Sequence, residues 1–443
     1  VRLQGLQAFL CALALVAVGF SAVAEARIRA DGGVTPVARA GSSLASERGI
    51  GRERLRGVLE REMDSVGGAS GAYVYDVDAN SNRLLYSDSG ATARILASNS
   101  KLFATGAYLN RFGADGRLET ALFARGKRKG GRERTLRGSL VLVGDGDPAL
   151  ATSRFARARN LPLTNLGPLA RAVKEAGIRR VDGNVLADPT IFDRATSVPM
   201  PGVTPDPGDL PTLSGLSFNR GTEGGGSAQS PARKAGAELV RALRERGVRV
   251  TGGVRVDGAP RSLMERDPLR TVASPTARAL IDQTNTPSDN FYAEMLLKRL
   301  GAGQAVQGTT ARGANRAEAF AREVDSGVSL VNGSGLARSN TASPKNVARY
   351  LTHFREDQDL KGAFYDSLAI AGRSGTLSDR MRGTAAEGRC VGKTGTINGV
   401  SALSGYCRAG AGTIAFSILM NNVSIDAARR AQDTMAAAIA RYR

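Results

Sequence analysis

Three short motifs in a fixed order hold the residues best suited to chemistry. The first is Ser98-Asn99-Ser100-Lys101, at the start of a predicted helix that ends at Gly113. Residues i and i+3 share a helix face, so the Ser98 hydroxyl and the Lys101 amine are expected to meet. Serine is a weak nucleophile until a base takes its proton, and burial or neighbouring positive charge lowers a lysine pKa enough for that task. The motif predicts a serine nucleophile with a lysine base, although the spacing alone also fits a solvated helix side.

The second motif is Ser288-Asp289-Asn290, which follows Pro287 and opens a predicted helix over 288–300. By itself it fits an ordinary helix N-cap.

The third motif is Lys393-Thr394-Gly395-Thr396, on a predicted strand. A glycine there lets a substrate backbone approach closely. The lysine and threonine side chains offer donors for a carboxylate. An ordinary hairpin strand is the alternative interpretation.

Together, in this order and in these contexts, the motifs are the signature of active-site-serine penicillin-recognising enzymes. Four further segments narrow the resemblance to the class C low-molecular-mass penicillin-binding proteins, which are D-alanyl-D-alanine carboxypeptidases and endopeptidases. These segments begin at Leu96, Gly144, Asn332 and Gly372. The long stretch between the first two motifs also resembles this family, which inserts extra domains there. The resemblance covers roughly residues 50–440.

The resemblance implies a role for each motif residue. Ser98 would be the nucleophile and Lys101 its base during acylation. Ser288 would relay a proton to the leaving D-Ala, while Asn290 would hold the peptide amide and Lys101. The remaining implied roles belong to the third motif. Lys393 and Thr394 would assist the relay and bind the terminal carboxylate, and Gly395 would let the substrate backbone approach. The backbone N–H groups of Ser98 and Thr396 would form an oxyanion hole.

Two residues outside the motifs also gain an implied role. The resemblance suggests that Asp147 and Arg338 meet the free end of a diaminopimelate side chain. A Gly-Asp-Pro turn and a surface arginine explain these two residues nearly as well.

The predicted fold class is α+β. A penicillin-recognising transpeptidase/β-lactamase-like domain, an antiparallel sheet with packed helices, is expected from residues 49–113 and 271–443. A large, mainly β inserted region, residues 114–270, lies between the first and second motifs. Predicted strands near 72–77 and 83–87 could join those near 390–396, 401–408 and 413–421 in one sheet.

Cysteine spacing adds a constraint on the last strands. Pairing Thr396 with Ser401 around a four-residue loop places Cys390 opposite Cys407, close enough to bridge. A disulfide is expected, and two reduced core cysteines are the alternative.

The N-terminal segment is predicted to direct export. Residues 1–24 fit a signal peptide that ends in Ala22-Val23-Ala24, and an uncleaved anchor is the alternative. Residues 25–48 are polar and aperiodic, which is typical of a flexible linker. The expected location is the periplasm or the extracytoplasmic cell envelope, with membrane contact only through this segment.

Composition limits the partners. The formal net charge is +20 at pH 7, which is compatible with nucleic acid or with an anionic envelope. The densest cationic run, residues 125–137, favours a solvated hairpin loop over a binding patch, and it lacks the interleaved aromatic residues of single-strand binders. No nucleic-acid partner is therefore expected.

The chain has a single histidine, His353, which argues against a metal site. No metal or cofactor is implied.

The sequence therefore predicts an exported D-Ala-D-Ala carboxypeptidase or endopeptidase that cleaves peptidoglycan stem peptides through a Ser98 acyl-enzyme. β-Lactams should acylate the same serine. A β-lactamase is one alternative, but no Glu-x-x-Leu-Asn-like segment that could activate water lies between the first two motifs. A non-catalytic basic cell-wall-binding protein is the other.

Overall fold

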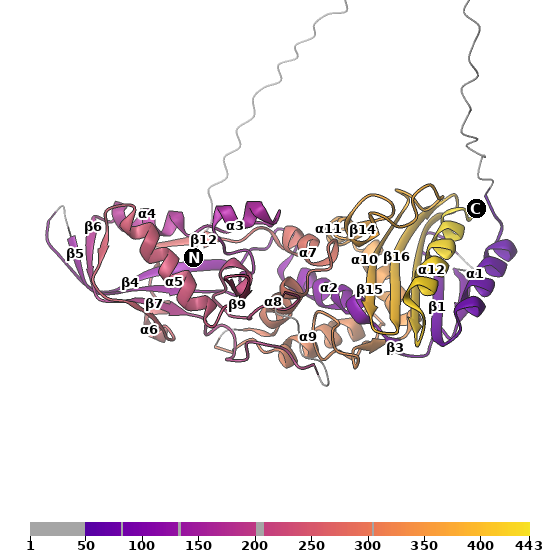
Figure 1. Cartoon of the computed structure of the whole chain (residues 1–443), viewed down its shortest axis with the longest axis horizontal. Helices are drawn as coiled ribbons and strands as arrows, with labels where there is room; N and C mark the ends of the chain where they lie inside the picture. The colour runs from indigo at the N-terminus through magenta and orange to yellow at the C-terminus, as the bar shows by residue number, and fades with distance from the viewer. Residues whose placement is uncertain (1–48, 81–82, 132–133, 201–207, 304) are drawn as a thin grey trace, which may run out of the picture. The chain divides into compact units, whose positions relative to one another are not determined.

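The structure is a computed structural model that describes residues 49–80, 83–131, 134–200, 208–303 and 305–443. The predicted signal peptide and linker lie outside the described residues. No helix within these ranges combines the length and the apolarity needed to cross a lipid bilayer. Two large sheets organise the described chain (Figure 1).

The first sheet joins the two ends of the described chain. Its order is β14-β15-β16-β17-β1-β2, and all neighbours are antiparallel. Because β1 pairs with β17, the predicted union of the first and last strand blocks is confirmed. The strands are β1 (Ala69–Asp76), β2 (Leu84–Asp88), β14 (Ala369–Ile370), β15 (Cys390–Ile397), β16 (Val400–Ala409) and β17 (Gly412–Asn421).

Helices cover both faces of this sheet, which is why β16 and β17 are buried almost throughout. One face packs on α1 (Arg52–Val66) and α12 (Ile425–Ala440), seen at the indigo and yellow ends of the chain in Figure 1. The other face packs on α10 (Pro344–Glu356). The helices that share a hydrophobic core with α10 are α2 (Ser100–Phe112), α7 (Ala277–Asn285), α8 (Asn290–Gly301), α9 (Thr310–Glu323) and α11 (Lys361–Asp366).

The β15–β16 hairpin has the register predicted from the sequence. Thr396 pairs with Ser401, and Cys390 pairs with Cys407. The two cysteines form a disulfide whose Cα atoms are 4.0 Å apart. The bridge closes the end of the hairpin away from the third motif.

The second sheet lies in the inserted region and mixes parallel with antiparallel pairs. β4 pairs antiparallel with β5 and β12, whereas β5 pairs in parallel with β6 and β7. Parallel pairing requires crossovers, and here α4 (Gly167–Glu175) and α5 (Pro231–Arg244) supply them and cover one face. The strands are β4 (Glu119–Lys129), β5 (Arg134–Val143), β6 (Ile178–Asp182), β7 (Val185–Asp188), β10 (Arg249–Val250), β11 (Val254–Val256) and β12 (Arg270–Ala273).

The cationic run is not the loop that the sequence favoured. Strands β4 and β5 continue through it, with Arg125 opposite Ser139 and Lys129 opposite Thr135. Charged side chains are tolerated in a strand where its face is open to solvent, and this part of β4 is exposed. The run is therefore part of a sheet face.

Several short elements complete the fold. They are α3 (Ser153–Ala158), α6 (Arg261–Met264), β3 (Arg94–Ile95), β13 (Thr341–Ala342), β8 (Thr222–Glu223), β9 (Gly226–Ser227), and the 3-10 turns η1 (Ala97–Asn99), η2 (Asn219–Gly221) and η3 (Gly375–Leu377).

Candidate active site

The first motif spans the turn η1 and the start of α2. The Lys101 amine is fully buried and lies 2.9 Å from the Ser98 hydroxyl oxygen. It also donates to the backbone oxygen of Ser334, at 2.6 Å. One turn of helix thus brings the hydroxyl and the amine together, as the i, i+3 spacing predicted.

The second motif reaches the same lysine. The Asn290 side-chain oxygen accepts a hydrogen bond from Lys101 at 2.7 Å. Asp289, rather than Ser288, caps α8, because its carboxylate accepts from the backbone N–H of Tyr292 at 3.1 Å. Ser288 has a φ of 67°, a left-handed conformation that costs free energy for a non-glycine residue and that often occurs at functional sites.

The third motif brings a second buried lysine. The Lys393 amine donates to the Ser288 hydroxyl at 2.8 Å and to the backbone oxygen of Thr394 at 2.9 Å. The Thr394 hydroxyl lies 2.7 Å from that of Thr376, a residue that the sequence reasoning did not single out. The site therefore contains two serine–lysine pairs, one built within the first motif and one built between distant segments.

Burial sets the electrostatics of both lysines. Desolvation lowers the pKa of Lys101 to about 7, against the opposing effect of Glu294, Asp289 and Asp209. Desolvation, and then the charge of Lys101, place the pKa of Lys393 well below its usual value. A lysine with a pKa near 7 is partly neutral at neutral pH, as a base for serine must be.

Glu294 is a buried group that the sequence reasoning missed. Its carboxylate accepts hydrogen bonds from the backbone N–H groups of Gly333, at 3.1 Å, and Ser334, at 2.7 Å. It thereby holds the turn whose Ser334 oxygen receives the Lys101 amine. Burial raises the pKa of Glu294. The available signal was an acidic residue four positions after Asn290, and therefore on the same helix face, next to mostly apolar neighbours in the sequence.

Two glycines allow backbone segments to approach Ser98. A Cβ on Gly335 would lie 1.9 Å from the Ala97 backbone oxygen, and its φ of 84° also favours glycine. A Cβ on Gly395 would lie 3.1 Å from the Ser98 nitrogen. Strand β15 and the 332–336 turn can therefore lie directly against Ser98.

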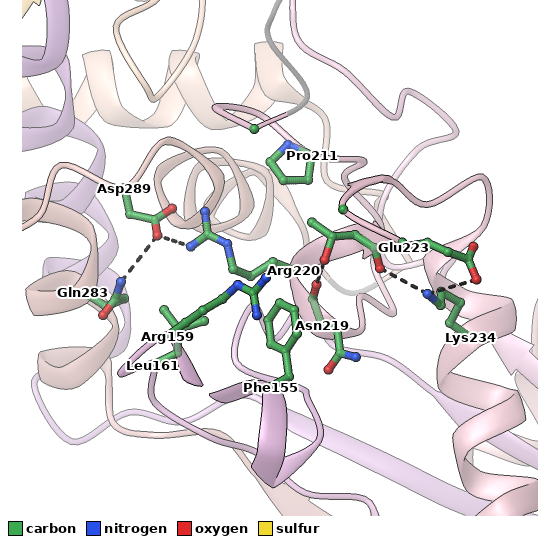
Figure 2. A pocket seen from close by; sticks show the side chains of 14 residues that line it. Phe155, Arg159, Leu161, Pro211, Asn219, Arg220, Glu223, Lys234, Gln283 and Asp289 are labelled. Atoms are coloured by element: carbon green, nitrogen blue, oxygen red, sulfur yellow. Dashed lines mark hydrogen bonds and ion pairs between the residues drawn. The ribbon is translucent and has the colours of Figure 1, made fainter. Parts of the chain in front are cut away.

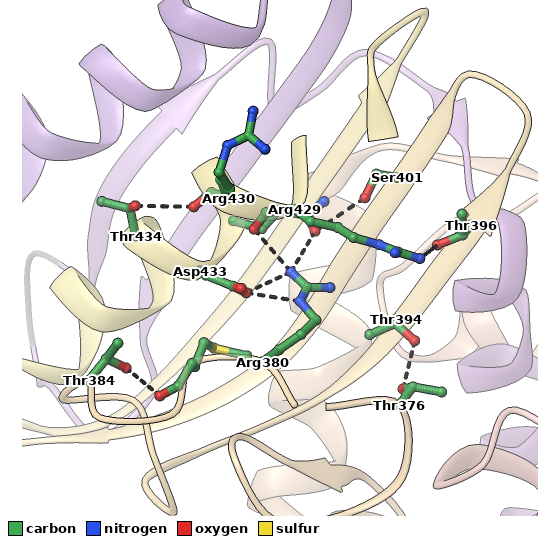
Figure 3. A network of polar contacts seen from close by, with 12 residues as sticks. Thr376, Arg380, Thr384, Thr394, Thr396, Ser401, Arg429, Arg430, Asp433 and Thr434 are labelled. Atoms are coloured by element: carbon green, nitrogen blue, oxygen red, sulfur yellow. Dashed lines mark hydrogen bonds and ion pairs between the residues drawn. The ribbon is translucent and has the colours of Figure 1, made fainter. Parts of the chain in front are cut away.

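A polar network links the third motif to α12 (Figure 3). Arg380 binds the Asp433 carboxylate at 2.7 Å and the Gln432 side chain at 3.1 Å. On the same helix, Arg429 is exposed and donates to the Thr396 hydroxyl at 3.4 Å. A guanidinium thus lies beside the strand at which a terminal carboxylate was expected to bind, and the sequence reasoning had not identified it.

Asp147 and Arg338 are not part of this cluster in any hydrogen bond or ion pair of the described residues. Asp147 is 2% exposed, and its burial raises the pKa to about 6. Arg338 is exposed and donates to the backbone oxygen of Asn398 at 2.7 Å. An ammonium group would reach Asp147 only if the surrounding side chains moved, so the joint role stays a prediction.

A cavity of about 620 Å³ adjoins the second motif (Figure 2). Arg220, from the inserted region, forms an ion pair with Asp289 on its wall. The guanidinium also lies 5.3 Å from the Phe291 ring centre and 5.8 Å from that of Tyr292. The inserted region therefore contacts the residue between Ser288 and Asn290.

We expect Arg220→Ala to slow acylation of Ser98 about tenfold, because a small displacement of catalytic groups has a cost of that order or more. The side chains of Arg220 and Asp289 are 17% and 7% exposed, so the variant also leaves a nearly buried carboxylate without its cation. The measurement is the acylation rate constant well below the unfolding temperature. Arg220→Lys should restore part of the rate, and Arg159→Ala, in the same cavity, should leave it unchanged. A lower unfolding temperature with an unchanged rate would limit Arg220 to a structural role.

The antiparallel sheet, its flanking helices and the paired serines and lysines place the chain among the penicillin-recognising serine enzymes. The sequence model of the D-Ala-D-Ala carboxypeptidase 3 (S13) family matches residues 57–206 and 220–442. The chain belongs to this family of serine peptidases.

Known proteins resemble the chain over most of its length. It is 30% identical to a D-alanyl-D-alanine carboxypeptidase of Actinomadura sp. (strain R39), over 88% of this chain and 84% of that protein. It is 27% identical to the carboxypeptidase DacB of Mycolicibacterium smegmatis, over 93% and 87%. The crystal structure of penicillin-binding protein 4 from Haemophilus influenzae matches with a TM-score of 0.70 and 19% identity, over 85% and 97%, which shows a shared fold.

Proposed function

We propose that the chain is an exported D-Ala-D-Ala carboxypeptidase that cleaves peptidoglycan stem peptides through an acyl-enzyme on Ser98. The observation that carries this proposal is the fully buried Lys101 amine, 2.9 Å from the Ser98 hydroxyl. Family membership and the carboxypeptidase relatives support the choice of substrate. The cell envelope outside the cytoplasm, where that substrate lies, is the proposed location.

In the acylation step, neutral Lys101 takes the Ser98 proton as the serine oxygen attacks the carbonyl carbon of the penultimate D-Ala. The developing oxyanion is stabilised by the backbone N–H groups of Ser98 and Thr396, which the absence of a Cβ on Gly395 allows to lie close together. Such donors typically contribute about 3–4 kcal/mol to lowering the barrier.

In the same step the C–N bond breaks and the leaving amine needs a proton. Ser288 donates its hydroxyl proton to that amine and takes up the proton that Lys101 removed from Ser98, which makes Lys101 neutral again. The Lys393 amine, 2.8 Å away, holds the Ser288 hydroxyl in place for this relay. Asn290 keeps Lys101 aligned and offers its amide nitrogen to the peptide. Water then hydrolyses the ester and restores Ser98, with Lys101 again the nearest base.

Thr394 and Arg429 are the groups proposed to bind the terminal carboxylate. The Thr394 hydroxyl is positioned by Thr376, and Arg429 supplies positive charge beside Thr396. A free carboxylate at the end of the peptide would distinguish a carboxypeptidase substrate from an internal bond. The same catalytic groups suit an endopeptidase if the leaving amine belongs to a neighbouring peptide.

β-Lactams are proposed to acylate Ser98. A relative by fold, the penicillin-binding protein 4 of Haemophilus influenzae, has been solved in complex with a β-lactam. Attack by Ser98 on the β-lactam carbonyl carbon would break the C–N bond of the ring. The product would be a serine ester of the same type that the peptide forms.

The test is release of free D-Ala from a soluble stem pentapeptide by purified protein, with a cross-linked muropeptide as second substrate. Release from the pentapeptide is expected for the wild type. No release from either substrate, by folded protein, would contradict the proposed function.

The acylation rate is expected to rise with pH through about 7. Lys101 must be neutral to accept the serine proton, and its pKa is about 7. Below that value the protonated fraction grows, so the rate should fall about tenfold per pH unit, and above it the rate should level off. The acylation rate constant, measured by stopped flow with a chromogenic β-lactam between pH 5 and 9, should show this rising limb of the pH profile.

Asp147→Asn is the control for this pH profile, because burial raises the pKa of that carboxyl to about 6. The limb should persist in this variant if Lys101 is its source. A rate that does not change with pH, or that falls as pH rises through 7, would rule out neutral Lys101 as the base.

A further inference from the structure

The outer part of the inserted sheet has one strongly cationic face. We call it the basic face, and it comprises Arg125, Lys127 and Lys129 of β4, Arg137 of β5, Arg180 of β6 and Arg249 of β10. These strands lie where β5 and β6 are labelled in Figure 1. None of the six residues belongs to the catalytic cluster.

Strand register places these side chains on the same face. Lys127 pairs with Arg137, and Arg180 pairs with both Thr135 and Arg249. Residues paired in a ladder point to the same side of a sheet, and alternate residues along a strand do so too. The opposite side carries Leu136, Val181 and Val250, which are buried beneath α4 and α5. The basic face is therefore the side that these two helices leave open.

The charges on this face are poorly balanced. Asp182, also on this face, forms an ion pair with Arg180 at 2.5 Å, and both side chains are partly exposed. Among the residues that the structure describes, no carboxylate forms an ion pair with the other five cations. Lys127 lies directly opposite Arg137, and like charges in that position destabilise a sheet. Folding alone gives no reason for this arrangement.

We propose that the basic face binds a linear anionic polymer of the cell envelope, one with repeating phosphate or carboxylate groups. Successive cations on β4 are about 7 Å apart and adjacent strands about 4.8 Å apart, so the charges form a flat array. Such an array fits an extended polyanion better than a single small anion. Nucleic acid is the less suitable partner, because the face has no aromatic side chain on which a base could stack. Binding there would hold the enzyme at its insoluble substrate.

The experiment measures binding of the purified protein to inorganic polyphosphate and to polygalacturonate, at several salt concentrations. The test variant is Arg125→Gln/Lys127→Gln/Lys129→Gln. The wild type should bind at least one polymer, and the variant should bind more than tenfold more weakly. The slope of log affinity against log salt should fall in magnitude by about 2 to 3, because three cation contacts are lost.

The matched control is Arg154→Gln/Arg157→Gln/Arg171→Gln, which removes the same charge from α3 and α4 in the same region. It should bind as the wild type does. Both variants should keep wild-type D-Ala release from a soluble peptide, and the test variant should unfold at the same or a higher temperature, since repulsion is removed. Equal loss of binding in both variants, no binding by the wild type, or tighter binding to single-stranded DNA than to either polymer would overturn the proposal. If the wild type released no D-Ala, that result would contradict the proposed function and not the proposed binding of a polymer.

Discussion

Replacing Lys101 by methionine is expected to slow acylation of Ser98 by about a thousandfold or more, because general-base catalysis typically contributes about 10²–10⁴ and Lys101 is the proposed base. Methionine keeps most of the side-chain volume but cannot accept a proton. It also removes the hydrogen bonds to Asn290 and to the Ser334 oxygen. Ser98 would remain in place without a base within hydrogen-bond distance.

The matched control for this variant is Lys298→Met. Lys298 is equally buried, but its amine binds Asp193 at 2.6 Å and does not contact Ser98. This control should lower the unfolding temperature and leave the acylation rate constant nearly unchanged. Adduct formation with a β-lactam, followed by intact mass against time, measures both variants. An acylation rate in Lys101→Met within tenfold of the wild type would show that another group acts as base.

The second large effect is expected from Gly335→Ala. The new Cβ would lie 1.9 Å from the Ala97 backbone oxygen and 2.9 Å from the Ser98 nitrogen, so backbone atoms must move. Movement of the 332–336 turn would carry away the Ser334 oxygen that orients Lys101. We expect D-Ala release to fall by about a hundredfold, the loss typical of a displacement near 1 Å.

Gly383→Ala separates this effect from the cost of a left-handed residue. Gly383 has a φ of 69°, similar to the 84° of Gly335, but a Cβ there would meet nothing within 4 Å. Both variants should lose stability because alanine is strained at a positive φ, and Gly335→Ala should lose more because of its clash, but only Gly335→Ala should lose activity. Equal activity in the two variants would show that the approach of Gly335 to Ser98 is not needed for catalysis.

Local geometry explains which parts of the site were predictable from the sequence. The Ser98–Lys101 contact depends on one helical turn, so the spacing alone predicts it. The hairpin that contains the third motif follows from a short loop flanked by strand-like residues, and its register places the two cysteines opposite each other. Helix α5 begins at Pro231 after its N-cap Ser230, and a Ser-Pro pair in these positions is typical of a helix start.

Contacts between distant segments were not predictable in this way. The Glu294–Ser334 hydrogen bond joins residues 40 positions apart, and the Arg220–Asp289 ion pair joins residues 69 positions apart. Strand β14 has two residues, too few to show an alternating pattern. The cationic run over 125–137 indicates a loop because glycines interrupt it between two apolar segments, and only the strand register shows that alternate side chains share an open face.

The burial of Asp147 is a related case. A Gly-Asp-Pro segment is typical of a surface turn, yet this aspartate is 2% exposed. Sequence pattern gives the local turn but not the segments that later cover it. The predicted contact with a substrate ammonium group therefore requires movement of the side chains that cover Asp147.

The central claim is that Ser98 is the acylated nucleophile. The most direct test is intact-protein mass spectrometry of residues 25–443 after incubation with benzylpenicillin, beside a Ser98→Ala variant. We expect one stable adduct with the mass of benzylpenicillin on the wild type, mapped to the peptide that contains Ser98, and none on the variant. An adduct of equal yield on Ser98→Ala, or unmodified wild type with intact penicillin recovered from the same sample, would contradict this claim.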